Sequence, residues 1–360
     1  MFRPMLLALI IASLMQPATQ AEAPKGSSST GAEPTGADAH IAAGTAAYGT
    51  KNYALSETLF KQAVSDLEAA GETGEKLGRA RVSLGNSYFV EHKYPEAEAV
   101  FLRGLAIEEK TLPANSAELG TTIESVGDAL RAQNKWKEAE GYYIRALAIR
   151  DKLPPDDDLG WTYHNLGVTE SQLKKTADAE KNFRQALAIR QSKPNDLNLA
   201  WTYYGLGDAC YALNKLDDAE KYWKLALRIR ENAYGASSPE LLGLLKNLGS
   251  YYFKRGQFPF ASSWYQRGWA IAEKGTPSLD TAWLANCLAD SLAVQGKVTP
   301  AEEMYKKALS IREKLAGPRS ELVAQTLDQY SELLRSTPRQ GEMKEMQARA
   351  AAIRKSPVKK

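Results

Sequence analysis

Small and apolar side chains recur at fixed distances along most of the chain. The clearest mark is a Gly or Ala that returns every 40 or 42 residues, at Gly85, Gly127, Gly167, Gly207, Gly249 and Ala289. Positions in each repeat are numbered from this mark, so that −6 lies six residues before it and +12 lies twelve residues after it. Self-similarity at such a period is the sequence signature of a repeat array.

Four positions after the mark predict one helix of each repeat. Position +12 is Ala, +16 is aromatic, +19 is Gly or Ala, and +22 is Ile in all six repeats. Steps of four, three and three residues place these side chains on one face of an α-helix. The small residues let two helix axes approach closely, and the aromatic and Ile side chains fill the space around that contact.

The mark itself lies in a preceding helix, usually in a Leu-Gly pair such as Leu206-Gly207. Gly inside a helix costs up to ~1 kcal/mol relative to Ala, so its recurrence predicts a site of close packing. Short polar turns such as Asn134-Lys135 separate the two helices. Weaker repeats around Gly44 and Ala350 extend the pattern, and the prediction is an all-α chain of about eight helical hairpins.

Charged residues gather at the two ends of the second helix. Acidic residues stand near its start, and position +23, at its end, is Arg150, Arg190, Arg230 or Arg312 in four repeats. Both charges suit the helix dipole. We therefore interpret the arginine row as helix-end chemistry rather than as a ligand site.

The first 23 residues have the pattern of a secretory signal peptide. Arg3 precedes the apolar run 5–15, which is shorter than the ~20 residues of a spanning helix, and 21–23 form an A-x-A cleavage site. An uncleaved membrane anchor is the alternative. A Gly- and Pro-rich flexible linker is expected at 24–37, the repeat array at 38–354 and a short basic tail at 355–360. The expected location is secreted or periplasmic, with no membrane span in the mature chain.

Composition and motifs argue against several classes of function. A formal net charge of +3 is too small to favour a nucleic-acid partner. The sequence has no H-E-x-x-H pair, P-loop or G-x-S-x-G motif, so we predict no catalytic residue, metal or cofactor. Cys210 is expected in the core. Cys210 and Cys287 lie two repeats apart, too far for a disulfide.

The repeat resembles the tetratricopeptide repeat, on the run Leu206-Gly207, Ala219-Glu220, Trp223 and 226–230. "ALAIR" at 146–150 and 186–190, and "ALSIREKL" at 308–315, resemble the longer repeats of the kinesin light chain type. The resemblance covers about residues 38–354. It implies a right-handed α-α superhelix, a solenoid whose first helices line a concave surface. The "GPDHP" link of that type is replaced by stretches such as PPDDDL, and a secretion signal argues against motor-cargo work.

The family register assigns positions −6, −3, −2, +1 and +4 of the first helices to the concave groove. The candidate partner-binding residues are therefore Trp161, His164, Asn165, Trp201, Tyr204, Asp208, Tyr211, Lys246, Asn247, Trp283 and Asn286. The three Trp residues share position −6. They either thicken the core or form an aromatic floor for a partner. The amides of Asn165, Asn247 and Asn286 could hold the main chain of an extended peptide.

The leading functional hypothesis is a non-enzymatic interaction scaffold that binds a peptide or protein segment in its concave groove. One alternative is a carbohydrate-binding or enzymatic protein that uses the Trp row as a platform. Asp208 and Asp290 lie two repeats apart and fit poorly the paired carboxylates of a glycosidase. Another alternative is a self-associating structural spacer. The partner's identity and the oligomeric state stay open.

Overall fold

The structure is a computed structural model that describes residues 36–192 and 196–355. The predicted signal peptide, residues 24–35 of the predicted linker and residues 356–360 of the predicted tail lie outside this range. Ala37, predicted in the linker, is the first residue of a helix, and Lys355, predicted in the tail, is the last residue of another. The chain divides into two compact units, the first ending at Arg190 and the second beginning at Gln191.

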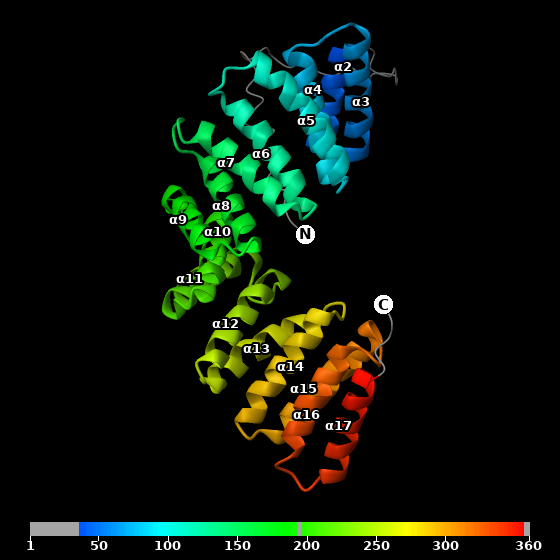
Figure 1. The fold of residues 1–360 in the computed structure, drawn as a ribbon, viewed down its shortest axis with the longest axis vertical. Coiled ribbons are helices and arrows are strands. Elements are labelled where there is room, and N and C mark those ends of the chain that lie inside the picture. Colours follow the sequence, from blue (N-terminus) through cyan, green and yellow to red (C-terminus); the bar gives the residue numbers. More distant parts are fainter. Residues whose placement is uncertain (1–35, 193–195, 356–360) are drawn as a thin grey trace. The chain divides into compact units, whose positions relative to one another are not determined.

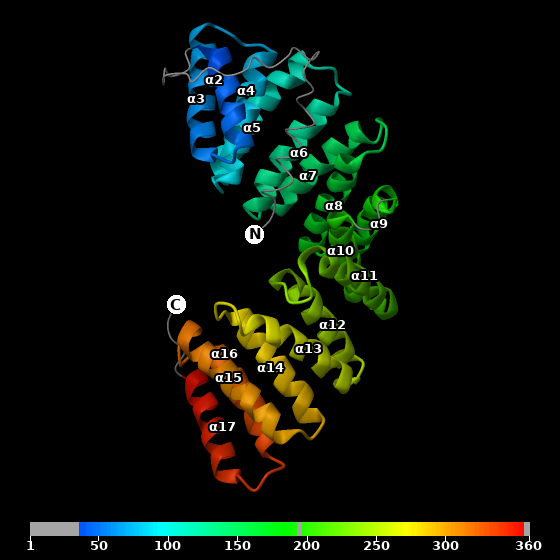
Figure 2. The same ribbon diagram turned by 180° about the vertical axis from the view of Figure 1, so that it is seen from behind.

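Each unit is a succession of helical hairpins, and the two helices of a hairpin lie side by side in both views (Figures 1 and 2). Unit 1 contains α2 (Ala37–Gly49), α3 (Tyr53–Ala69), α4 (Glu75–Val90), α5 (Tyr94–Thr111), α6 (Ala117–Ala132), α7 (Trp136–Arg150), α8 (Asp157–Gln172) and α9 (Thr176–Arg190). Unit 2 contains α10 (Leu197–Ala212), α11 (Leu216–Tyr234), a 3-10 turn η1 (Pro239–Leu241), α12 (Leu242–Lys254), α13 (Phe258–Ala272), α14 (Leu279–Val294), α15 (Val298–Ala316), α16 (Glu321–Leu334) and α17 (Gln340–Lys355). The even-numbered helices are the first helices of the hairpins. The described residues hold eight hairpins and no strand, which confirms the predicted all-α solenoid.

One turn geometry joins the two helices in seven of the hairpins. The residue at position +7 has a left-handed backbone, with φ between 59° and 71°. It is a non-glycine residue in five hairpins and Gly256 or Gly296 in two. The sequence indicated polar turns here, and the structure shows that one backbone reversal serves different side chains.

The mark of each repeat packs against the +16 aromatic side chain of the same hairpin. At Gly249, an added Cβ atom would lie 2.4 Å from a ring carbon of Tyr265, closer than two carbon atoms can pack. The six alanines at +12 are completely buried beside this contact. The predicted reason for the recurring glycine, a close helix–helix approach, is confirmed.

Candidate binding site

The arginine row at +23 is buried between hairpins and is not confined to exposed helix ends. Arg150, Arg190, Arg230 and Arg312 are each only 3–5% exposed. Two of these guanidinium groups lie over the −6 tryptophan of their own repeat, Arg190 at 4.2 Å from the ring centre of Trp161 and Arg230 at 3.9 Å from that of Trp201. This is the geometry of a cation–π contact. The helix-dipole interpretation from sequence misses this role.

The three candidate residues of unit 1 are buried side chains. Trp161, His164 and Asn165 are 7%, 6% and 3% exposed. The Trp161 and His164 rings meet edge to face, with centroids 5.2 Å apart. Arg190 covers the Trp161 ring and donates through Nε to Asp157, at 3.0 Å. In this unit the structure places the predicted groove residues in the packing between hairpins.

Amide side chains at −2 bond to aspartates at +1 of the preceding repeat, and we call this set the inter-repeat ladder. Its amides are Asn165, Asn247 and Gln329, and they donate to Asp128, Asp208 and Asp290 at 3.3, 2.6 and 3.0 Å. Each aspartate also accepts a hydrogen bond from the +16 aromatic of its own repeat, namely Tyr143, Trp223 or Tyr305. The carboxylate thus fixes one hairpin internally and joins it to the next.

The amide side chains that were predicted to bind a partner already form hydrogen bonds within the protein. Asn165 donates to Glu124 as well as to Asp128, and Asn247 donates to Asp208. Asn286, at −3, donates to Gln329 and Asp290. Desolvation raises the pKa of Asp208 above its ordinary value although its side chain keeps contact with solvent, and the hydrogen bonds from Trp223 and Asn247 oppose this rise.

The positions of the two cysteines can be described in the same repeat numbering. Cys287 stands at −2, opposite Ser250 at +1, and the Tyr265 hydroxyl lies 3.0 Å from the Ser250 hydroxyl. Ser250 and Cys287 thus replace the aspartate and the amide of the ladder at this junction, and burial raises the pKa of the Cys287 thiol. Cys210 is completely buried, as expected, and both thiols are free.

Seven of the eight candidate residues of unit 2 keep more solvent contact, and the exception is Asn286, which is 4% exposed. Trp201, Tyr204, Tyr211, Lys246, Asn247 and Trp283 are all half-buried. The guanidinium of Arg230 lies over the rings of both Trp201 and Tyr204. The ammonium of Lys254 lies 4.7 Å from the ring centre of Tyr211. Basic side chains from α11 and α12 therefore cover the aromatic rings of α10.

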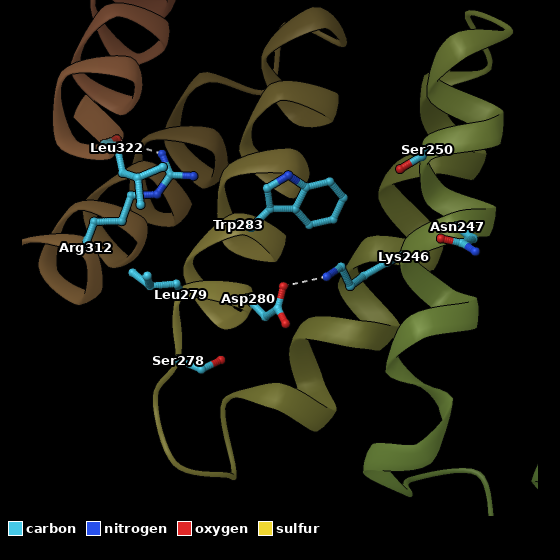
Figure 3. Close-up of a pocket in the computed structure, with 9 residues that line it drawn as sticks. All are labelled: Lys246, Asn247, Ser250, Ser278, Leu279, Asp280, Trp283, Arg312 and Leu322. Carbon is cyan, nitrogen blue, oxygen red and sulfur yellow. Dashed lines mark hydrogen bonds and ion pairs between the residues drawn. The ribbon is translucent and has the colours of Figure 1, made fainter. Parts of the chain in front are cut away.

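A pocket of about 720 Å³ opens among α12, α14, α15 and α16. Figure 3 shows the Lys246 side chain extending toward Trp283, with Arg312 on the far side of Trp283. The remaining lining residues are Asn247, Ser250, Ser278, Leu279, Asp280 and Leu322. The volume is typical of a small-molecule site or of a cleft for part of a peptide. Three sequence-predicted residues line this pocket, namely Lys246, Asn247 and Trp283. A fourth, Asn286, lies one helical turn beyond Trp283 and is not in the lining.

The two basic groups of the pocket differ in their partners. Lys246 forms an ion pair with Asp280 at 2.7 Å, and its ammonium lies 4.8 Å from the ring centre of Trp283. Arg312 donates to the carbonyl of Leu322 at 2.9 Å and to the Thr326 hydroxyl. Within residues 196–355, no carboxylate lies within ion-pair distance of Arg312.

Arg312, Asp280 and Leu322 were not among the sequence-predicted site residues. Arg312 was assigned to helix-end chemistry, and the other two lie at −9, outside the groove register taken from the family. The signal that could have found them is the pairing of +23 in one repeat with −9 in the next. Asp158 fills −9 opposite Arg150, at 3.5 Å, whereas Leu322 fills it opposite Arg312.

The part of the chain that the structure describes has neither a metal-binding cluster nor a membrane-spanning helix. No cluster of three His, Cys, Asp or Glu side chains there has the geometry to hold a metal ion. None of the helices in that part combines the length and the apolar character needed to cross a bilayer.

The family model for the tetratricopeptide repeat matches residues 118–192, 198–274 and 280–356, more than half of the chain. The chain belongs to the tetratricopeptide repeat family. The arrays of such solenoid proteins form extended binding surfaces, and the coarse functional prediction, an interaction scaffold, follows from this membership. None of the curated proteins compared with the chain matches it.

Solved structures show the same fold at low identity. BtubC (BKLC) of P. vanneervenii is 22% identical, with a TM-score of 0.50, over 56% of this chain and 82% of that protein. A putative kinesin light chain of Podosopora anserina is 16% identical, with a TM-score of 0.49, over 56% and 97%. A STAND-type signal-transduction ATPase with a tetratricopeptide repeat sensor, from Pyrococcus horikoshii, is 12% identical, with a TM-score of 0.63, over 84% and 44%. The predicted tetratricopeptide repeat family is confirmed by the family model.

Proposed function

We propose that this tetratricopeptide repeat protein is a non-enzymatic scaffold that binds a segment of a partner protein on the first helices of unit 2. The observation that carries the proposal is the contrast between the units. Trp161, His164 and Asn165 are buried in unit 1, whereas Lys246 and Trp283 open onto a pocket in unit 2. A tryptophan half-buried in a pocket is the kind of side chain that dominates binding energy at protein interfaces.

The test is a screen of random displayed peptides against the purified protein, followed by fluorescence anisotropy on the peptides selected. We expect Trp283→Ala to weaken their binding by roughly tenfold or more, because a pocket aromatic contributes at least that much when truncated. Trp136→Ala is the matched control, since Trp136 is also half-buried but lies at the start of α7 in unit 1. Equal binding by both variants would place the interaction on another face, and a screen that yields no peptide would contradict the scaffold itself.

The proposed compartment is secretory or periplasmic. Its support is the sequence of residues 1–23, which has a basic start, a short apolar run and an A-x-A site. Intact-mass measurement of the protein recovered from its native host tests this proposal. A chain that begins after Ala23 is expected, and a full-length chain retained inside the cell would refute export.

A further inference from the structure

Arg312 is a buried cation that forms no ion pair within residues 196–355, and the charge of Asp290 acts on it only from beyond ion-pair distance. The whole residue is 5% exposed, and its Nε atom is buried without a hydrogen-bond partner. Two of its bonds go to neutral oxygens, the carbonyl of Leu322 and the hydroxyl of Thr326. Figure 3 shows its guanidinium directed toward the side of the pocket that holds Trp283. A buried charge is normally paired or bonded to a charged partner, so this group is an exception to be explained.

Other repeats supply the missing carboxylate from their own chain. At the same +23 position, Arg150 has Glu124 at 3.3 Å and Asp158 at 3.5 Å. Arg190 has Asp157 at 3.0 Å. Leu322 occupies the position of Asp158 opposite Arg312, and the preceding residue, Glu321, pairs with Arg354 instead. Of Arg150, Arg190 and Arg312, only Arg312 lines the pocket, and it is the one that forms no ion pair within the described residues.

Arg230 shows what a second arginine without a carboxylate does in the same unit. No ion pair joins it to another residue of the described range, and Trp201 and Tyr204 present their rings to its guanidinium at 3.9 and 5.2 Å. Glu240 stands at −9 there, but it accepts from Arg230 through its backbone carbonyl, at 3.2 Å, so aromatic rings and not a carboxylate cover this guanidinium. The tryptophan at −6 of the Arg312 repeat, Trp283, is instead contacted by Lys246 from the neighbouring hairpin.

The charges that line the pocket sum to one uncompensated positive charge. Lys246 forms an ion pair with Asp280, whereas Arg312 forms none, and Asp290, which is outside the lining, acts on Arg312 only from beyond ion-pair distance. A single excess positive charge suits a monoanion better than a doubly charged phosphate group. Leu279, Trp283 and Leu322 add apolar surface beside it, and Leu279 is 42% exposed.

We propose that the pocket binds a ligand group in which one carboxylate pairs with Arg312 while an adjoining apolar side chain packs on Trp283 and Leu322. The inference rests on the proposed function, because it names the chemistry of the segment that the scaffold would bind. The planar guanidinium holds a carboxylate through parallel hydrogen bonds, which makes the pair directional as well as strong. The carboxylate can come from an internal Asp or Glu or from a chain terminus, and the test separates these sources.

Four small probes test the proposal on the full chain. N-acetyl-leucine and N-acetyl-leucinamide differ only in a terminal carboxylate. The capped tripeptides acetyl-Leu-Glu-Leu-amide and acetyl-Leu-Gln-Leu-amide differ only in an internal one. Binding is followed by the shifts of arginine Nε–H signals in nitrogen-15 NMR spectra, and the Arg312 signal is assigned by its loss in Arg312→Gln.

The decisive variant restores the acid that the other repeats carry. In Leu322→Asp, the new carboxylate is expected to pair with Arg312 and to abolish the preference for acidic probes without unfolding the chain. Leu322→Asn has nearly the same size without the charge and is expected to keep the preference. Arg335→Gln removes an exposed arginine that directly follows α16, 64% exposed in its side chain, and controls for net charge.

We expect at least one acidic probe to bind the parent protein about tenfold more tightly than its neutral counterpart, since a charge-assisted pair to a buried guanidinium is strong. Preference in the tripeptide pair alone identifies an internal acid, and preference in the leucine pair alone identifies a terminus. Equal binding of acidic and neutral probes, or a preference that survives in Leu322→Asp, overturns the inference. Peptides from the displayed screen could still bind in that case, so the scaffold proposal would stand independently.

Discussion

Glu108 occupies, in the repeat marked by Gly85, the +23 position that holds arginine in four other repeats. Glu108 is 1% exposed, and its Oε2 atom has no hydrogen-bond partner. Desolvation raises the pKa of this carboxyl to about 7, with further rises from Glu118 and Glu75 and opposition from Thr122 and Arg79. The charges of this repeat are exchanged, because arginine stands instead at −6, where Arg79 pairs with Glu118.

Glu108→Gln should change how stability depends on pH. Between about pH 4.5 and pH 7, Glu108 keeps its proton in the folded chain and loses it in the unfolded chain. The free energy of unfolding of the parent protein therefore falls as pH rises through this window. The variant lacks this fall and should be more stable than the parent at pH 8, by on the order of 2 kcal/mol. Urea denaturation followed by circular dichroism at pH 5 and pH 8 measures the difference.

The neighbouring Glu109 provides the control for this prediction. It is exposed and pairs with Arg145 on the surface. Glu109→Gln should therefore leave the pH profile nearly parallel to that of the parent. If the profile of Glu108→Gln is also parallel to that of the parent, Glu108 is ionised in the folded chain at pH 5. That result would contradict the rise in its pKa that is assigned to burial.

Two glycines inside helices test the packing between helices of a hairpin. Gly249→Ala puts a methyl group 2.4 Å from the Tyr265 ring, whereas Gly141 in α7 has no atom within 4 Å of the same added carbon. We expect Gly249→Ala to lower the free energy of unfolding by about 1–3 kcal/mol through overpacking. Gly141→Ala should raise it by about 0.5–1 kcal/mol through helix propensity. Denaturant titration of both variants decides, and a stabilisation of equal size in both would show that helix propensity and not contact sets the effect.

The hairpins could be predicted from the sequence because each helix carries its own periodic face. Glycine at the mark and the aromatic at +16 belong to one repeat, and their contact follows from spacing within it. The arginine row and the ladder could not be predicted in this way, because Arg150 and Asp128 bond to residues of the following repeat. Their partners are defined by the register between hairpins, which the apolar pattern does not encode.

The candidate site shows the same division. Lys246 and Trp283 came from the family register and line the pocket of unit 2. Trp161 has the same position as Trp283, yet Arg190 covers it. Position along the first helix therefore does not distinguish a groove residue from a core residue, and the side chain at +23 must be considered with it. The sequence left the groove and core alternatives for the Trp row open, and the structure buries Trp161 between hairpins while Trp283 lines a pocket.

At the scale of the whole molecule, the principal contacts run between neighbours in chain order. Within each unit, every helix packs against the helix before and the helix after it. Stability in such an array is approximately a sum over repeats and their interfaces. The ladder contributes to the interface terms, since Asp128 bonds to Tyr143 in its own hairpin and to Asn165 in the next.

Asp128→Ala is therefore expected to have a local effect. It leaves the Tyr143 hydroxyl and the Asn165 amide with one acceptor fewer in a buried place, which should cost about 1–3 kcal/mol. Amide hydrogen exchange followed by mass spectrometry should accelerate in α6, α7 and α8, while α14–α17 keep the protection of the parent. Glu109→Ala, which removes an exposed carboxylate from the same unit, should leave the exchange pattern unchanged. If exchange in Asp128→Ala instead rises uniformly along the described helices, the chain unfolds as a single cooperative body, and the neighbour-only account of its stability is wrong.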